Sequence, residues 1–341
     1  MKQVKLVDVA KEAGVSASTV SQYLSGRYKH MSKDTKDRIE EVIKELNYIP
    51  NSIARSLKTD KTNTIGVIVF SINGFYTSNV VRAIDDYCKK HNYNVLIYNT
   101  DYDPEIEKKS INILKMLRVD GIIIASTGHN NKMILEENLH GIPIVQMYME
   151  FDDLEVCTVI SDYRAAAYKA TQYLIELGHK DIAVVTQPYE NIRSRYNRIL
   201  GYVDALQENN IPFDQNLIYK WDRHHDINLV FDSLCGRENL PTAIFSMNES
   251  STTDLLRYLK AKDYSVPEDF SVLGFDQLPA VDLMKTPVTI VEQPTYELGE
   301  KTAELLISKI NNKGRNKMTK TRIELECNFQ VRESCRDINP K

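Results

Sequence analysis

The chain has 341 residues, of which 42% are apolar and 26% charged, the composition of a globular protein with two or three domains. This balance excludes a disordered chain, a collagen repeat and a small disulfide scaffold, and apolar runs such as 64–70 are far shorter than the roughly 20 residues that span a bilayer. Charge is uneven: residues 1–61 carry 12 Lys or Arg against 8 Asp or Glu, and the rest carry 31 against 39, so only the basic head suits a polyanion.

Residues 1–46 predict a separate helical domain built on a helix-turn-helix. Two helical stretches, 6–13 and 16–24, flank a glycine. Ala10 is small where the two helices cross, Gly14 allows the positive φ of a tight turn, and Ser16 can cap the second helix. An ordinary helical hairpin would explain one such match, but here every position of the unit fits.

The second helix of such a unit lies in the major groove of DNA. Ala17, Ser18 and Gln22 would then face base edges, and Thr19 and Ser21 would reach phosphates. The DNA-contacting residues predicted in the head are Ser16, Ala17, Ser18, Thr19, Ser21, Gln22 and His30.

Residues 47–61 form a polar, basic linker that contains Pro50. Asn51 can cap a short helix over 51–57. Because isolated helices below about 12 residues are marginal in water, we expect this helix to form only on DNA.

From residue 62 to the end, short apolar strands alternate with amphipathic helices such as 78–91, 164–178 and 296–312, the last two ending at Gly178 and Gly314. The strands are expected at 64–70, 94–98, 121–125, 142–145, 181–185, 242–245, 271–275 and 289–291. Continuous apolar strands are typical of parallel sheets covered on both faces. We therefore predict an α/β core, residues 62–341, of two lobes: about 62–161 plus 293–320, and about 162–290 plus 321–335.

The cysteines and the first residues indicate the compartment. The five cysteines have no C-x-x-C spacing, which suits buried thiols in a reducing environment: Cys88, Cys157, Cys235, Cys327 and Cys335. Residues 1–5 lead into a polar segment without the apolar core of a secretion signal, so we expect a cytoplasmic protein.

An ordered series of motifs resembles the lactose-repressor (LacI) family of bacterial transcription regulators. The motifs are Asp8-Val9-Ala10, Ala13-Gly14-Val15-Ser16, Ser18-Thr19-Val20-Ser21, Asn47-Tyr48-Ile49-Pro50-Asn51, Ala54-Arg55-Ser56-Leu57, Val119-Asp120-Gly121, Leu177-Gly178-His179, Val266-Pro267-Glu268-Asp269 and Gly274-Phe275-Asp276. The resemblance implies a DNA-binding head, a hinge and a core like that of periplasmic sugar-binding proteins. Gln22 departs from the arginine usual in the family, and the loop 25–31 is one residue longer than in the lactose repressor.

The resemblance also implies a role for the hinge. Two hinge helices, one per subunit, would fold against each other in the minor groove and insert Leu57 into the central base step. Alternatively, Leu57 packs within the linker. The hinge residues predicted to contact DNA are Asn51, Ala54, Leu57 and Lys58.

In the core, the residues that follow strands are candidates for binding a small molecule, because ligands of open α/β sheets bind beyond the carboxyl ends of the strands. By resemblance, Arg198 matches an effector-binding arginine and Trp221 an aromatic that stacks on the ligand. The predicted effector-binding residues are Phe75, Tyr76, Asp162, Arg198, Trp221, Asn248, Asp276 and Gln293. Individually, Asn248 and Asp276 could cap strand ends and Trp221 could pack in the core.

Aromatic, amide, carboxylate and guanidinium groups together suit a polyhydroxylated ring, so a sugar is the first expectation. Arg193, Arg195 and Arg198 leave a sugar phosphate or sugar acid open.

No signature of a hydrolase, P-loop, dinucleotide-binding or zincin site occurs, and we expect no catalytic residue, metal or cofactor. The segment 222–226 could be imagined as a metal site, but adjacent histidines point apart and a solvated loop is the better interpretation.

We therefore predict a homodimeric repressor of carbohydrate genes that binds palindromic double-stranded operator DNA. The tail 327–334 lacks the apolar heptads of a tetramerising coiled coil. Two rival functions are a sugar-binding transport component and a carbohydrate enzyme with Asp162 and Asp276 as acid and base.

Overall fold

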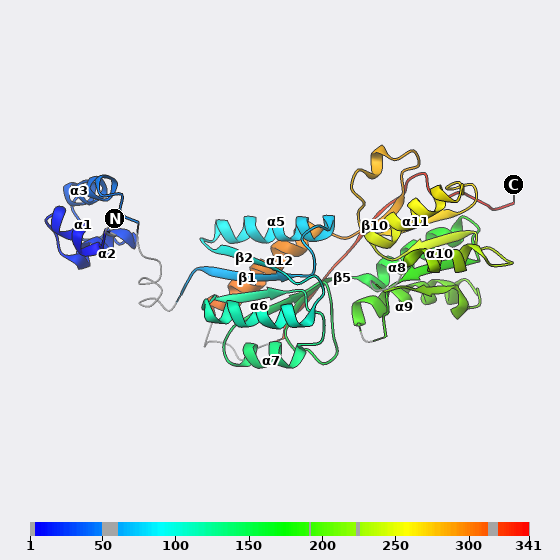
Figure 1. Ribbon diagram of the computed structural model, residues 1–341, viewed down its shortest axis with the longest axis horizontal. Coiled ribbons are helices and arrows are strands. Elements are labelled where there is room, and N and C mark those ends of the chain that lie inside the picture. The colour runs from blue at the N-terminus through cyan, green and yellow to red at the C-terminus, as the bar shows by residue number, and fades with distance from the viewer. Residues whose placement is uncertain (1–3, 50–60, 191, 223–225, 313–319, 341) are drawn as a thin grey trace. The chain divides into compact units, whose positions relative to one another are not determined.

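The computed structural model describes residues 4–49, 61–190, 192–222, 226–312 and 320–340 (Figure 1). The chain divides into two compact units, Met1–Thr62 and Asn63–Lys341. The predicted hinge contacts Asn51, Ala54, Leu57 and Lys58 lie outside the described residues, as do Gly314 and the histidines of the 222–226 segment. No helix of the described part is long and apolar enough to cross a bilayer.

The first unit is a three-helix domain of α1 (Leu6–Glu12), α2 (Ala17–Leu24) and α3 (Lys33–Glu45). Its small core is apolar and includes Val9, Ala10, Val20, Ile39 and Val42. Ala10 is buried where the sequence requires a small residue, and Gly14 has the predicted positive φ of 60°. The helix-turn-helix is thus confirmed.

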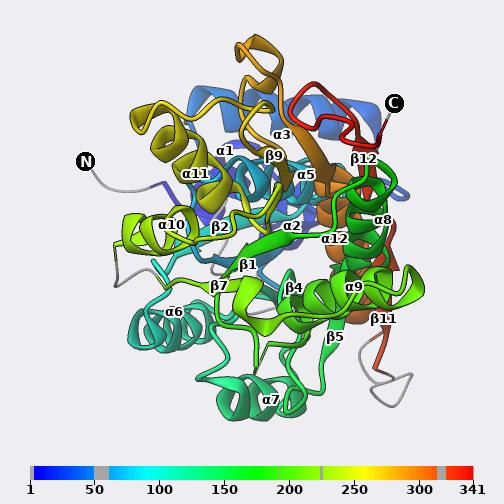
Figure 2. The same cartoon turned by 90° about the vertical axis from the view of Figure 1, so that its right-hand side faces the viewer.

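The first lobe of the second unit is a six-stranded parallel sheet with helices on both faces. Figures 1 and 2 place α5 and α12 on one face and α6 and α7 on the other. The sheet order is β11-β5-β4-β3-β1-β2. The elements are β1 (Thr64–Val69), α5 (Phe75–Lys90), β2 (Asn94–Asn99), α6 (Pro104–Met116), β3 (Gly121–Ile124), α7 (Asn131–Leu139), β4 (Ile144–Met147), β5 (Cys157–Ser161), α12 (Thr295–Asn311) and β11 (Arg322–Leu325).

The second lobe repeats this plan with the order β12-β10-β9-β8-β6-β7, in which only the pairing of β12 is antiparallel. Helices α8 and α9 pack together, and Figure 2 shows α10 and α11 away from them. The elements are α8 (Tyr163–Glu176), β6 (Ile182–Thr186), α9 (Arg193–Glu208), η1 (Gln215–Leu217), β7 (Ile218–Lys220), α10 (Ile227–Cys235), β8 (Ala243–Ser246), α11 (Glu249–Ala261), β9 (Ser271–Phe275), η2 (Val281–Leu283), β10 (Thr289–Glu292) and β12 (Asn328–Gln330).

The close packing of α8 on α9 depends on Gly201. A Cβ at this position would lie 2.1 Å from the carbonyl oxygen of Arg164, too close for any side chain. The two helices therefore approach along a surface without a side chain at that point.

The lobes exchange the chain three times, after β5, after β10 and after β11. The predicted lobe boundaries are wrong in the last exchange, since 321–335 was assigned to the second lobe. Arg322–Leu325 pairs with β5 and belongs to the first sheet, and only Asn328–Gln330 adds to the second. The tail alternates polar and apolar residues and gave no continuous apolar run to mark an edge strand.

Two further expectations need correction. Strand β2 is not covered on both faces, because it is the edge of its sheet and Leu96 and Ile97 are exposed. All five cysteines are free, but only three are buried, and Cys235 and Cys335 are half-buried.

Candidate functional site

In the first unit, α2 presents a polar face. Ser16 caps this helix by accepting the N–H of Thr19 at 3.1 Å, and Val20 is buried in the core of the unit. Ser16, Ser18, Gln22 and His30 are exposed, and Ala17, Thr19 and Ser21 are half-buried. Every DNA-contacting residue predicted in the described head therefore has surface available.

In the second unit, a cavity of about 270 Å³ lies where strand order reverses in both sheets. In the first lobe its wall begins at the ends of β1 and β3, with Phe70 and Ala125. In the second lobe it includes residues just after β6, β8 and β9, namely Gln187, Asn248 and Asp276. This is the edge at which open α/β sheets bind small molecules.

Aromatic rings form much of the first lobe's wall. Phe70 stacks on Tyr102 with centroids 4.4 Å apart, and Tyr148 lies 4.9 Å from Tyr76. The Tyr76 hydroxyl is buried and has no hydrogen-bond partner among the described residues. Flat apolar faces beside an unsatisfied hydroxyl suit a ligand with both C–H faces and hydroxyl groups.

Asp276 supplies a carboxylate to the cavity while being only 4% exposed. Gln293 donates from Nε2 to its Oδ1 at 2.5 Å and accepts a bond from Ser161 at 2.8 Å. Gln293, which does not line the cavity itself, therefore orients the Asp276 carboxylate through this hydrogen bond.

Arg198 lies in a small hollow beside the cavity and is 5% exposed. Its guanidinium is 4.6 Å from the Tyr163 ring centroid and 4.1 Å from that of Phe275, and it donates to the carbonyl of Met247. It also interacts electrostatically with Asp276. Cation–π contacts and a nearby carboxylate stabilise this buried charge.

Glu249, which the sequence analysis did not single out, joins the two lobes. It is the first residue of α11, and its carboxylate lies near the start of α5, where the backbone N–H groups of Phe75 and Tyr76 act to lower its pKa. Burial, and then the charge of Asp276, raise the pKa of Glu249 above its usual value.

Some of the predicted effector residues line the cavity, some lie next to it, and some do neither. Tyr76, Asn248 and Asp276 line the cavity. Arg198 lies in the adjoining hollow, and Gln293 lies behind Asp276.

Phe75, Asp162 and Trp221 do not line the cavity that the described residues form. Asp162 caps α8 by accepting the N–H of Ala165 at 3.0 Å. It lies where the chain crosses from the first lobe to the second, and its role there is to cap the helix. Trp221 packs in the apolar core of the second lobe. Phe75 is the first residue of α5, and its backbone N–H acts to lower the pKa of Glu249.

The cavity contains residues that sequence reasoning missed: Phe70, Asn73, Tyr102, Tyr148, Gln187 and Glu249. Gln187 directly follows β6 and comes two residues after the predicted strand 181–185, so the strand-end rule could have found it. Tyr102 and Tyr148 have positive φ values of 63° and 70°, a conformation that tyrosine rarely adopts and that the sequence does not reveal.

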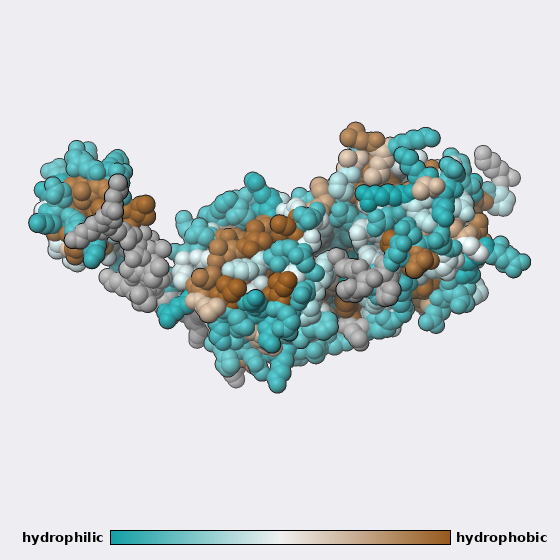
Figure 3. Space-filling model, viewed as in Figure 1, coloured by the Kyte–Doolittle hydropathy of each residue, from teal (hydrophilic) through white to brown (hydrophobic). Residues whose placement is uncertain are grey.

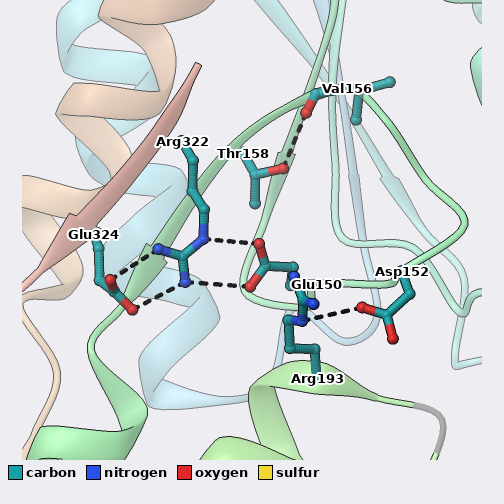
Figure 4. A network of polar contacts seen from close by, with 7 residues as sticks. All are labelled: Glu150, Asp152, Val156, Thr158, Arg193, Arg322 and Glu324. Carbon is teal, nitrogen blue, oxygen red and sulfur yellow. Dashed lines mark hydrogen bonds and ion pairs between the residues drawn. The ribbon is translucent and has the colours of Figure 1, made fainter. Parts of the chain in front are cut away.

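The other two arginines considered for an anionic ligand have protein partners. Arg193 pairs with Asp152 at 3.0 Å, and its backbone N–H donates to the carbonyl of Glu150 (Figure 4). Arg195 donates to the carbonyl of Pro188 at 2.9 Å. Neither residue lines the main cavity.

Arg322, the first residue of β11, links this strand to the segment that follows β4. Its guanidinium binds the buried carboxylate of Glu150 at 2.8 Å and that of Glu324 at 2.8 Å (Figure 4). Arg193 of the second lobe binds Asp152, which lies in the same segment as Glu150. The network therefore holds this segment of the first lobe against the start of α9 in the second lobe.

We expect Arg322→Met to lower the free energy of unfolding by about 2 kcal/mol, because it leaves the buried Glu150 carboxylate unpaired while Arg322 itself is partly exposed. Urea denaturation followed by circular dichroism measures this. Arg257→Met is the control, since Arg257 forms a surface pair with Asp254 and should change stability by under about 1 kcal/mol. Equal effects of the two substitutions would contradict the role given to the network.

Comparison with known proteins identifies the family. Residues 5–51 match the bacterial regulatory proteins of the lacI family, and residues 62–333 match the periplasmic binding proteins and sugar binding domain of the LacI family. A probable HTH-type transcriptional regulator, EndR of Paenibacillus polymyxa, is 39% identical over 308 residues, 90% of each chain.

The HTH-type transcriptional repressor PurR of Actinobacillus pleuropneumoniae is 31% identical over 333 residues, 97% of this chain and 98% of that protein. The solved structure of the transcriptional regulator CelR with cellobiose is 26% identical, covers 97% of this chain and 100% of its own, and superposes with a TM-score of 0.70. These relatives are regulators of transcription and not enzymes. The chain belongs to the LacI family of transcriptional regulators, with a DNA-binding head and a sugar-binding type of core.

Proposed function

We propose that this protein is a cytoplasmic repressor of carbohydrate-utilisation genes whose hold on DNA is controlled by a sugar or sugar derivative bound in the cavity. The observation that carries the proposal is the cavity itself. It combines aromatic faces, an unsatisfied tyrosine hydroxyl and the Asp276 carboxylate at the reversal points of both sheets. The cellobiose complex of CelR supports a sugar as the ligand class.

The proposed effector contacts are Tyr76, Asn248 and Asp276 in the cavity wall, with Arg198 alongside them. Gln293 acts through Asp276. An enzyme with Asp162 and Asp276 as a catalytic pair is disfavoured, because Asp162 caps a helix and does not line the cavity.

On the DNA side, α2 is proposed to enter the major groove, with Ser18 and Gln22 at base edges and Thr19 and Ser21 at phosphates. The hinge contacts Asn51, Ala54, Leu57 and Lys58 remain a proposal from the family resemblance.

Selection of binding sites from a random duplex pool, followed by release assays with a panel of sugars, tests the function. We expect one palindrome to be enriched and its affinity to change with one class of sugar. No preference for any palindrome over scrambled duplex, with or without sugars, would contradict the proposal.

The same selection tests the role of Gln22. Its exposed amide matches the N6 and N7 edge of adenine, whereas arginine matches guanine. We expect Gln22→Arg to shift the preferred base at one position of each half-site from adenine to guanine, by about 1–3 kcal/mol of discrimination. Recovery of the same site by both proteins would show that Gln22 does not read that base.

We also propose that the protein is a homodimer and that strand β2 contributes to its interface. Val95–Tyr98 is an apolar run on the edge strand of the first sheet, yet Leu96 is 36% and Ile97 47% exposed. Nearby in sequence, Met116 and Leu117 at the end of α6 are also exposed. Figure 3 shows apolar side chains gathered on the first lobe between α5 and α6. A second copy is the proposed cover, because a palindrome is read by two equivalent heads.

A further inference from the structure

Two acidic side chains, Asp276 and Glu249, line the cavity, and different groups interact with each carboxylate. Asp276 interacts electrostatically with the buried guanidinium of Arg198 and is held by Gln293. The Glu249 carboxylate instead lies at the N-terminus of α5, beside Gly74 in the cavity wall, where the N–H groups of Phe75 and Tyr76 act to lower its pKa. Among the described residues that line the main cavity, there is no lysine, arginine or histidine.

The start of α5 is a place where an anion would otherwise bind. The N-terminus of a helix offers unpaired N–H groups and a partial positive charge, which suit a phosphate or carboxylate. Gly74 at the N-cap position gives α5 no side-chain cap. A Cβ on Gly74 would lie 3.9 Å from the Glu249 carboxylate, so the second lobe's own carboxylate fills this position at the cavity wall.

We propose that Glu249 is a specificity-determining residue that occupies the anion position at the start of α5 and excludes negatively charged ligands from the cavity. The inference rests on the proposed effector function and narrows it. Of the sugar, sugar phosphate and sugar acid classes, only the uncharged sugars fit this wall.

The surroundings of Glu249 favour this exclusion. Burial and the neighbouring Asp276 charge already raise the pKa of Glu249, so the site disfavours the negative charge it holds. A phosphate or carboxylate on a ligand would bring a further negative charge next to both carboxylates. Like charges brought together in a buried site weaken binding strongly.

The test compares Glu249→Ala, Glu249→Gln and the control Glu268→Gln in the full-length protein. Glu268 is an exposed glutamate of the same lobe. Isothermal titration with glucose, cellobiose, glucose 6-phosphate, gluconate and inorganic phosphate measures charge preference. Thermal denaturation in inorganic phosphate gives a second measurement that needs no knowledge of the natural effector.

We expect the wild-type protein and Glu268→Gln to bind neither phosphate nor the anionic sugars measurably at the cavity. Glu249→Ala exposes the N–H groups of α5 and should gain at least about tenfold in affinity for inorganic phosphate, with a rise in melting temperature that Glu268→Gln does not show. Glu249→Gln, which keeps the shape but not the charge, should gain less.

Two outcomes overturn the inference: binding of glucose 6-phosphate to the wild type as tightly as glucose, or no gain in phosphate affinity in Glu249→Ala. Failure of the proposed function has a different signature, since no sugar would then bind or alter operator affinity. The phosphate measurement still decides the role of Glu249 in that case.

Discussion

Replacing Asp276 with alanine is expected to abolish the change in operator affinity that the effector causes. The carboxylate lies in the cavity wall, is 4% exposed, and interacts with Arg198 and Gln293. Its removal takes away an acceptor for ligand hydroxyls and leaves the Arg198 charge buried with less compensation. Truncating one member of a buried charge pair costs about 2–5 kcal/mol, so we expect effector affinity to fall by at least about thirtyfold.

Titration of the effector against the protein, and against the protein bound to fluorescent operator, measures both parts of this effect. Asp276→Asn keeps a hydrogen-bonding group beside Gln293 and should lose less affinity than the alanine variant. Asp254→Ala, which removes a surface partner of Arg257, is the control and should respond like the wild type. A melting temperature of each variant separates loss of binding from loss of folding. An unchanged response in Asp276→Ala would remove this residue from the effector site.

Much of the fold could be predicted because its signals are local. Apolar runs such as 64–70 and 271–275 became β1 and β9, and the helix expected over 164–178 became α8, which stops before Gly178 with that glycine at a positive φ. These patterns depend on residues close together in the chain. The sheet membership of Arg322–Leu325 depends instead on pairing with β5, more than 150 residues earlier, and no local pattern encodes it.

The site was predictable to the extent that strand ends define it. Asn248 and Asp276 were found because each lies within two residues of the end of a strand, and both line the cavity. The rule failed at Asp162, where a carboxylate after β5 caps α8. It could not find Tyr148 or Glu249, whose roles follow from an unusual backbone angle and from a contact between lobes. Sequence periodicity carries information on neither.

At strand β2 the sequence predicts a buried strand, whereas the structure of the single chain leaves part of it exposed. Its run Val95–Tyr98 has the composition of a strand covered on both faces, yet β2 pairs only with β1 and leaves Leu96 and Ile97 exposed. An exposed apolar edge strand is an aggregation hazard unless something covers it. A second copy of the chain meets this requirement and also supplies the second head that a palindrome needs.

We therefore expect Ile97→Asp to convert the protein to a monomer. Because the Ile97 side chain is 47% exposed, the aspartate can stay in water in the monomer and should leave the fold intact. In the dimer it would place a charge in an apolar interface without a partner. Analytical ultracentrifugation measures the oligomeric state, and Leu139→Asp, at a 63% exposed leucine of α7, is the matched control that should remain dimeric.

The loss of the dimer should have a larger effect on DNA binding than on any property of the core. Two linked heads bind two half-sites with an affinity that exceeds that of one head by a factor of roughly 10²–10⁴. Operator affinity of Ile97→Asp should fall by at least about a hundredfold, whereas its affinity for the effector should change little, since Ile97 does not line the cavity. Persistence of the dimer in the double variant Leu96→Asp and Ile97→Asp would show that the two copies meet on another surface. Loss of effector binding in a monomeric Ile97→Asp would instead show that the cavity depends on the second subunit.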